Sequence, residues 1–162
     1  DKVIFLPDEF LAQNIANQTD VKIISWKGRC EVHERFTAKE ILAYKEQHEN
    51  IVVLAHPECS PEVIEVSDFT GSTAGMNNYV KDNQPEKVIM VTECSMSDNV
   101  AIENPNVEFV RPCNLCPHMK RITLKKIYDA LRFDQHEVTV DNQIIDKARL
   151  SIDRMLEIGR QK

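Results

Sequence analysis

The sequence lacks three features that would each assign a protein to a class. No apolar run approaches the roughly 18 residues of a membrane-spanning helix, so no membrane association is predicted. There is no excess of basic residues, because 20 Lys and Arg stand against 26 Asp and Glu, and the net charge of -6 argues against a nucleic-acid-binding surface. There is no regular, even-numbered set of cysteines, because the five present are unevenly spaced. This pattern favours a reducing compartment over a disulfide framework, and we expect a cytoplasmic protein.

The composition that is present is that of a packed domain. Apolar residues make up 42% of the 162 residues and charged residues 28%, which suits the core of about one ordinary domain. Val3–Leu6 reads as a buried strand directly after Asp1. Because natural chains rarely open in the middle of a sheet, we expect a piece of a longer protein. A full-length protein trimmed of a tag is the alternative.

Short runs rich in Val and Ile alternate with helix-like stretches. The predicted strands are Val3–Leu6, Val21–Trp26, Ile51–Ala55, Val88–Thr92 and Val107–Val110. The predicted helices are Asp8–Asn17, Ala38–Gln47, Pro61–Val66 and Gly75–Lys81. The strands show no clean alternation of polar and apolar residues, which suits strands covered on both faces. The pattern predicts an α/β fold of repeated three-layer α/β/α domains with parallel sheets.

Several polar residues mark helix boundaries. Thr37 with Glu40 resembles a capping box, and Ser60 before Pro61 fits an N-cap followed by a first helical residue. The tail differs from the rest of the chain. Its pattern predicts helices over Leu124–Leu131 and Ile144–Ile158 and a strand, His136–Val140, between them. Asn142 is the predicted N-cap of the last helix.

A weak internal repeat gives two cysteines equivalent positions. Val3 begins a strand, helix and strand that lead to Cys30, 27 residues later, and Val88 begins the same order leading to Cys116, 28 residues later. Each cysteine follows the carboxyl end of a strand, the edge where parallel α/β sheets bind ligands. A third unit of this kind would place another cysteine upstream of residue 1.

Two short motifs contain residues that bind metals. Cys30 and His33 form a C-x-x-H pair, and Cys113 and Cys116 form a C-x-x-C pair. Spacing alone leaves open a structural zinc site using all four, an iron–sulfur site using some of the thiolates, and a redox pair of Cys113 and Cys116. The plainest alternative is four ordinary residues without a ligand.

Two polar segments follow the strand Ile51–Ala55. His56 and Glu58 would leave the carboxyl edge of the sheet as a general acid/base pair, unless they form only a solvated turn, and Cys59 is expected to be a packed side chain. Gly71-Ser72-Thr73 opens a helix and could bind phosphate or carboxylate, unless its hydroxyls only cap that helix. We also expect Cys94 to be a non-ligand, and Met96 and Met119 to be packing residues.

Taken together, these segments resemble the quinolinate synthase family over essentially the whole chain. The matching segments are Leu6-Pro7-Asp8, Trp26 to His33, His56-Pro57-Glu58-Cys59, Gly71-Ser72-Thr73 and Cys116-Pro117-His118-Met119-Lys120. In that family, three similar α/β domains in a pseudo-threefold arrangement surround one [4Fe-4S] cluster, and each supplies one cysteine. The resemblance therefore implies that residues 1–34 complete a middle domain, 35–116 form a third domain, and 117–162 pack on a first domain absent from this sequence.

The resemblance also implies roles for individual residues. It makes Cys30 and Cys116 cluster ligands and Cys113 a non-ligand. The implied catalytic residues are Glu58, His33 and His56, and the implied substrate-binding residues are Ser72, Thr73, His56 and Glu58.

The implied reaction condenses iminoaspartate with dihydroxyacetone phosphate to quinolinate, with loss of phosphate and water, in NAD biosynthesis. The implied functional partner is L-aspartate oxidase or aspartate dehydrogenase, and this chain alone is expected to be colourless and inactive. The alternative is a non-enzymatic α/β module stabilised by zinc on Cys30, His33, Cys113 and Cys116.

Overall fold

The computed structural model describes residues 2–160. The chain divides into two compact units, Asp1–Lys120 and Arg121–Lys162, and each is described by itself. The three domain ranges implied by the resemblance stay a prediction.

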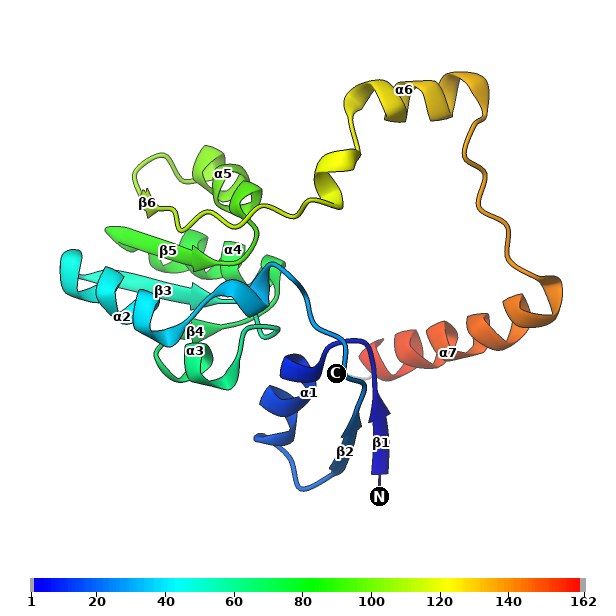
Figure 1. Cartoon of the computed structure of the whole chain (residues 1–162), viewed down its shortest axis with the longest axis horizontal. Helices are drawn as coiled ribbons and strands as arrows, with labels where there is room; N and C mark the ends of the chain where they lie inside the picture. Colours follow the sequence, from blue (N-terminus) through cyan, green and yellow to red (C-terminus); the bar gives the residue numbers. More distant parts are fainter. Residues whose placement is uncertain (1, 161–162) are drawn as a thin grey trace. The chain divides into compact units, whose positions relative to one another are not determined.

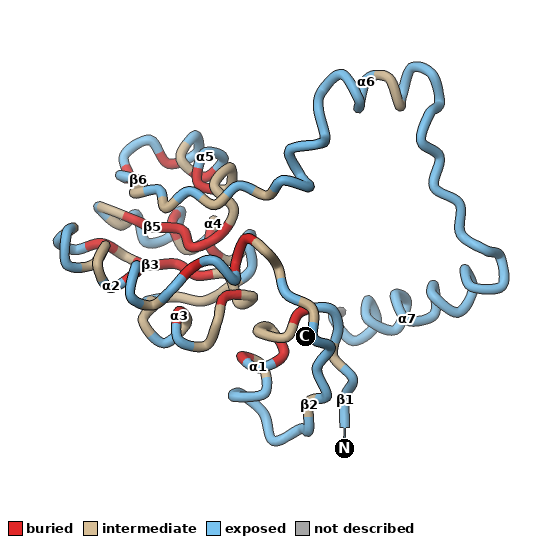
Figure 2. The backbone as a smooth tube through the Cα atoms, viewed as in Figure 1, coloured by how far each residue is buried: buried red, intermediate tan, exposed pale blue. Residues whose placement is uncertain are grey.

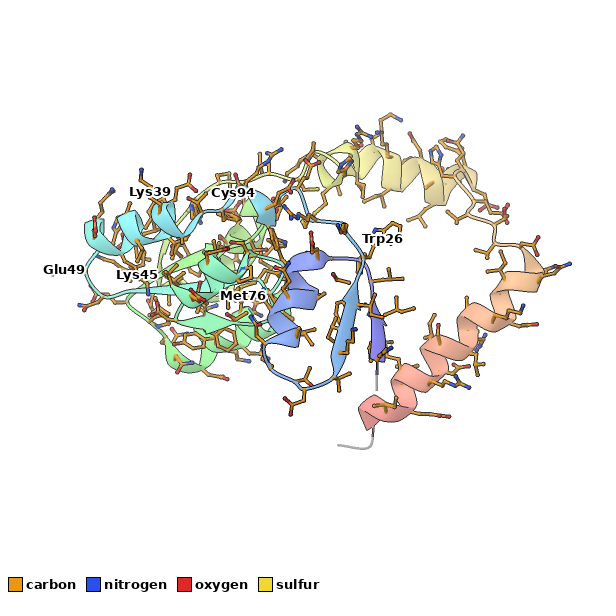
Figure 3. All side chains as sticks on the ribbon, turned by 60° about the horizontal axis from the view of Figure 1, so that its bottom comes forward. Trp26, Lys39, Lys45, Glu49, Met76 and Cys94 are labelled. Carbon is orange, nitrogen blue, oxygen red and sulfur yellow. A yellow bond between two sulfur atoms is a disulfide. The ribbon has the colours of Figure 1, made fainter. Side chains whose placement is uncertain are left out.

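The first unit begins with a small parallel pair of strands. β1 (Lys2–Phe5) and β2 (Lys22–Ser25) pair in parallel and are joined by α1 (Glu9–Ala16), as the sequence predicted (Figure 1). Ile4 and Trp26 remain largely exposed, and Trp26 projects from the end of β2 in Figure 3. Exposed apolar side chains gathered on a sheet are typical of a surface that packs against another element.

The rest of the first unit is built on a four-stranded parallel sheet with the order β4-β3-β5-β6. Its strands are β3 (Ile51–Ala55), β4 (Phe69–Thr70), β5 (Lys87–Val91) and β6 (Glu108–Val110). Its helices are α2 (Ala38–Gln47), α3 (Pro61–Glu65), α4 (Thr73–Asn83) and α5 (Cys94–Glu103).

The two central strands, β3 and β5, are buried along most of their length (red in Figure 2) with a core on each face, which explains their nearly continuous apolar sequences. Val53 and Ile89 point to a core shared with Ile41 of α2 and Val63 of α3. The intervening strand residues Leu54, Val88 and Met90 point the other way, into a second core. The helices α4 and α5 contribute Met76, Val80 and Val100 to this core. The predicted α/β fold with parallel sheets in three layers is therefore confirmed.

The local signals were mostly right. Thr37 and Glu40 form a complete capping box at the start of α2. Ser60 precedes Pro61 at the start of α3 as predicted, although its hydroxyl makes no capping bond. The two-residue strand β4 was not predicted, because two residues carry no readable pattern.

The second unit contains α6 (Leu124–Phe133) and α7 (Asn142–Arg160), with a short 3-10 helix, η2 (Met119–Arg121), at the junction of the units. The predicted strand His136–Val140 is wrong: these residues are irregular. A strand needs a neighbour for its backbone groups, and none pairs with this segment within the described residues. Asp141, not Asn142, caps α7, because its Oδ1 accepts the Gln143 N–H at 2.7 Å. Among the described residues, no helix is both long and apolar enough to cross a membrane.

Candidate functional site

The candidate site lies at the carboxyl edge of the four-stranded sheet. A pocket of about 400 Å³ opens there, and its wall includes Cys30, Cys116, His33, His56 and Glu58. These residues are separated by up to 86 positions in the sequence. His56, Glu58 and Cys116 follow strands of this sheet, whose carboxyl ends meet at one edge, whereas Cys30 and His33 come from the loop after β2 of the two-stranded sheet.

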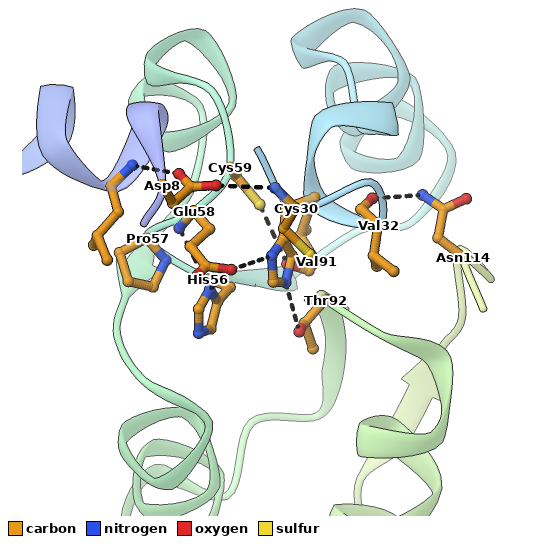
Figure 4. Close-up of polar contacts among 12 residues, drawn as sticks. Asp8, Cys30, Val32, His56, Pro57, Glu58, Cys59, Val91, Thr92 and Asn114 are labelled. Atoms are coloured by element: carbon orange, nitrogen blue, oxygen red, sulfur yellow. Dashed lines mark hydrogen bonds and ion pairs between the residues drawn. The ribbon is translucent and has the colours of Figure 1, made fainter. Parts of the chain in front are cut away.

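His33 is held at both ring nitrogens. It is buried in the short 3-10 helix η1 (His33–Arg35) that follows Cys30. Its Nδ1 lies 3.0 Å from Glu58 Oε2, and its Nε2 lies 3.0 Å from Thr92 Oγ1 (Figure 4). A carboxylate only accepts, so Nδ1 carries the proton and the Thr92 hydroxyl donates to Nε2. This arrangement fixes the orientation of both the imidazole and the carboxylate.

His56 stacks on His33. The two ring centroids are 4.4 Å apart and the planes differ by 7°. His56 Nδ1 accepts the backbone N–H of Glu58 at 3.3 Å, which leaves the proton on Nε2. Within the pair, each ring therefore keeps one defined tautomer.

Burial makes both imidazoles neutral near pH 7. It lowers the pKa of His33, although the Glu58 carboxylate opposes this effect. Burial, together with the neighbouring His33, lowers the pKa of His56 from 6.5 to about 4. Neutral imidazoles act here as fixed hydrogen-bond donors and acceptors rather than as stored positive charge.

The cysteines divide into three kinds. Cys30 and Cys116 are free, half-buried thiols in the wall of the pocket. Cys59 is fully buried, and burial raises the pKa of its thiol to about 12, so it is the packed side chain that was expected. Cys94 and Cys113 form a disulfide.

The disulfide corrects one expectation and weakens two of the alternatives. The uneven cysteine pattern favoured reduced thiols, but two of the five are paired. The redox pair of Cys113 and Cys116 does not form, because Cys113 bonds to Cys94 instead. The four-ligand zinc set also loses Cys113. In the sequence, Cys116 is the nearest cysteine to Cys113. The fold instead brings the start of α5, which carries Cys94, against the loop after β6, which carries Cys113.

Three residues of the pocket place potential metal-ligand atoms close together. One potential ligand atom each from Cys30, His33 and Glu58 lies within 4.8 Å of the others. However, both nitrogens of His33 are occupied by Glu58 and Thr92. A metal ion on His33 would have to break one of these hydrogen bonds, so the geometry favours a hydrogen-bonded His33–Glu58 pair over a ligand set.

The predicted anion-binding segment has a structural role at one residue. Ser72 caps α4, with its hydroxyl accepting the Gly75 N–H at 3.1 Å. Thr73, the first residue of α4, lines the pocket. Substrate binding by Ser72 and Thr73 stays a prediction.

The structure adds pocket residues that sequence reasoning did not select. Thr92 follows β5 as His56 follows β3, but the predicted strand Val88–Thr92 included it as its last residue, so its place at the strand end was the available signal. Ser95 and Asn99 line the pocket from α5 and carried no sequence signal. Met96 packs on the second core as expected, but Met119 is exposed at the pocket rim, contrary to the prediction.

Comparison with known proteins matches this geometry to one family. The family model described as "Quinolinate synthetase A protein" matches residues 1–157. Quinolinate synthase 1 of Mesorhizobium japonicum is 61% identical over 155 residues, covering 96% of this chain and 48% of the relative. Quinolinate synthase of Sinorhizobium fredii is 60% identical over 158 residues, covering 98% and 44%, and that of Caulobacter vibrioides is 57% identical, covering 98% and 43%.

The chain therefore spans less than half the length of the curated relatives it matches. The match to the family model nevertheless extends over nearly all of the chain and includes each segment that forms the pocket. The chain belongs to the quinolinate synthetase A family.

Proposed function

We propose that this chain is part of a quinolinate synthase that condenses iminoaspartate with dihydroxyacetone phosphate, with loss of phosphate and water, in NAD biosynthesis. The observation that carries the proposal is the pocket in which the Glu58–His33 pair lies beside two free thiols. A carboxylate can transfer protons and thiolates can hold an iron–sulfur cluster, which are the two roles that the proposed mechanism assigns to this pocket.

Cys30 and Cys116 would be two of the three cysteine ligands of a [4Fe-4S] cluster. The donor set fits this group, because both thiols are free, half-buried and in the wall of the same pocket. The third thiolate would come from a part of the polypeptide outside this sequence. When bound, a cluster with one iron free of protein ligands supplies a Lewis acid for a substrate oxygen.

Glu58 would remove the proton next to the carbonyl or imine carbon. Its hydrogen bond from His33 Nδ1 holds the carboxylate in one orientation, as a general base requires. His56 Nε2, the protonated nitrogen of that ring, would donate to a substrate oxygen. Thr73 and Ser72 begin α4, where free backbone N–H groups favour the anionic phosphate or carboxylate of a substrate.

The role of Glu58 can be tested with Glu58→Gln, which keeps the shape of the side chain but removes the base. Turnover to quinolinate should fall about 10²- to 10⁴-fold while iron and sulfide content stay normal. The matched control is Glu62→Gln, because Glu62 is a carboxylate on the nearby helix α3 and does not line the pocket. The assay uses the polypeptide at its natural length. Wild-type turnover by Glu58→Gln with an intact cluster would contradict the assignment.

The cluster can be tested by measuring iron, zinc and acid-labile sulfide in the natural-length polypeptide, purified without oxygen. About four irons and four sulfides per chain are expected, the content of one [4Fe-4S] cluster. Cys30→Ser should lose most of both, and Cys59→Ser, which alters a packed cysteine outside the pocket, should keep them. Zinc without sulfide would overturn the cluster proposal and would favour a zinc site with fewer ligands than the predicted set of four.

Two further parts of the proposal concern the setting of the enzyme. Iminoaspartate would be supplied by L-aspartate oxidase or aspartate dehydrogenase, and the reaction would take place in the cytoplasm. With only two of three thiolates, the 162-residue chain alone should be colourless and inactive. An iron-loaded, brown preparation of this chain would overturn that expectation.

A further inference from the structure

The buried carboxylate of Asp8 accepts hydrogen bonds from two separate backbone segments, one of which carries Cys30. Asp8 follows β1, is only 3% exposed, and caps α1. Its Oδ1 accepts the Leu11 N–H at 2.8 Å, which is the capping bond. Its Oδ2 accepts the backbone N–H of Cys30 at 2.9 Å, across 22 residues of sequence (Figure 4). The same side chain therefore starts a helix and holds the backbone of the cysteine.

Glu93 occupies the corresponding place behind Cys116. It follows β5 and caps α5, with Oε2 accepting the Ser95 N–H at 2.8 Å. Its Oε1 accepts the backbone N–H of Cys116 at 3.4 Å and lies 3.8 Å from Lys120 Nζ. The Glu93 side chain is 12% exposed.

The backbone shows that these two positions are equivalent. Asp8 pairs with Gly28 and Glu93 pairs with Asn114 in single parallel bridges, and each partner lies two residues before the cysteine. The residue after each acid donates its N–H to that same partner: Glu9 to Gly28 at 2.8 Å and Cys94 to Asn114 at 3.2 Å. The internal repeat thus includes the carboxylate as well as the cysteine. Capping needs one oxygen, yet both repeats use the second oxygen on the cysteine backbone.

We propose that Asp8 and Glu93 are positioning residues that hold Cys30 and Cys116 in the orientation needed to bind the cluster, and that each places a negative charge behind its ligand. The inference rests on the cluster proposed above. Hydrogen bonds to a carboxylate are stronger than those to neutral acceptors, and the contact of Asp8 with Cys30 at 2.9 Å is shorter than that of Glu93 with Cys116 at 3.4 Å. Groups that orient metal ligands commonly change metal affinity, and charge near an iron–sulfur cluster changes its reduction potential.

Amide variants separate this role from helix capping. Asp8→Asn and Glu93→Gln keep the shape and one acceptor oxygen, but they present an NH₂ group in place of the second oxygen. One of the two N–H groups then faces a donor, and the charge is gone. Asp8→Ser and Glu93→Ser keep a good capping hydroxyl that is too short to serve the cysteine as well. Thr37→Ala is the control, because it removes a helix cap at α2 that contacts neither cysteine.

The experiment uses the natural-length polypeptide purified without oxygen, and measures the rate of iron loss to a chelator and the reduction potential of the cluster. The amide and serine variants should lose iron about 10- to 100-fold faster than wild type, the range typical for groups that orient metal ligands. Their potentials should move to more positive values, because removal of a negative charge favours the reduced cluster. Thr37→Ala should match wild type in both measurements. The potential distinguishes the proposed role from a simple loss of stability.

The outcomes separate this inference from the proposed function. If wild type holds iron and sulfide but the four variants match it in iron loss and potential, the positioning role is overturned and the proposed function stands. If the amide variants fail to fold, the serine variants decide the question by the same two measurements. If wild type contains no sulfide, the proposed function fails, and this inference fails with it.

Discussion

Acidification should destabilise the protein through His56. Burial next to His33 lowers the pKa of His56 to about 4, whereas an unfolded chain has the ordinary value of 6.5. The folded protein therefore binds this proton less readily than the unfolded chain does. The stability that comes from keeping His56 neutral is complete above pH 6.5 and is lost as the pH falls from about 6.5 towards about 4.

The size of the effect follows from the two pKa values. Linkage predicts a loss of about 2 kcal/mol between about pH 7.5 and about pH 5, and about 3 kcal/mol by about pH 4. The His56 side chain is 18% exposed, so solvent screens it only in part. A loss of this size is a large fraction of the stability of an ordinary domain.

Urea unfolding of the metal-free protein, followed by circular dichroism at the two pH values, measures this loss. The matched variant is His56→Asn, which has no proton to gain and whose Oδ1 can take the place of Nδ1 in accepting the Glu58 N–H. Wild type should lose about 2 kcal/mol more than the variant between about pH 7.5 and about pH 5. His33 is present in both proteins, so its own contribution largely cancels. Equal losses in the two proteins, or an NMR titration of His56 centred near its ordinary pKa, would refute the reasoning.

Two further substitutions test the geometry around the pocket. Thr92→Val should leave His33 Nε2 buried without its hydrogen-bond donor and should lower the free energy of unfolding in urea by about 1–3 kcal/mol. Thr92→Ser should restore most of that stability. Equal stability of wild type and Thr92→Val would argue against the hydrogen bond. Gly28→Ala should destabilise the folded protein by about 1–3 kcal/mol and impair iron retention, because the added Cβ would lie 2.6 Å from the Pro7 carbonyl oxygen. Gly159→Ala is the control and should change neither property, because no atom lies within 4 Å of the added Cβ. Normal iron retention by Gly28→Ala would show that the Cys30 loop tolerates the shift.

The disulfide shows why a motif alone can give the wrong partner. The C-x-x-C spacing of Cys113 and Cys116 left a redox pair open as one alternative. In the fold, Cys94 begins α5 directly beside the loop that carries Cys113, and Cys116 is left as a free thiol in the pocket. A sequence gives the separation along the chain, but disulfide formation depends on separation in space.

The sequence by itself determined the fold class of the first unit and the edge where its site lies. Ile51–Ala55 and Val88–Val91 are apolar without alternation because both faces of each strand are covered, and this pattern is visible in the residues alone. The capping box at Thr37 and the placement of Cys30 and His56 after strands were also readable, because they depend on neighbours close in sequence. The tail was less readable: His136–Val140 has the composition of a strand but no partner strand among the described residues.

Only the tertiary structure decided which side chains act together. The contacts of His33 with Thr92, of Asp8 with Cys30, and of Glu93 with Cys116 join residues 59, 22 and 23 positions apart. No local pattern encodes such pairs, because they arise only when the loops that follow the parallel strands of the two sheets come together in the folded chain. The low pKa of His56 has the same origin, since burial and the stacked His33 ring exist only in the folded chain.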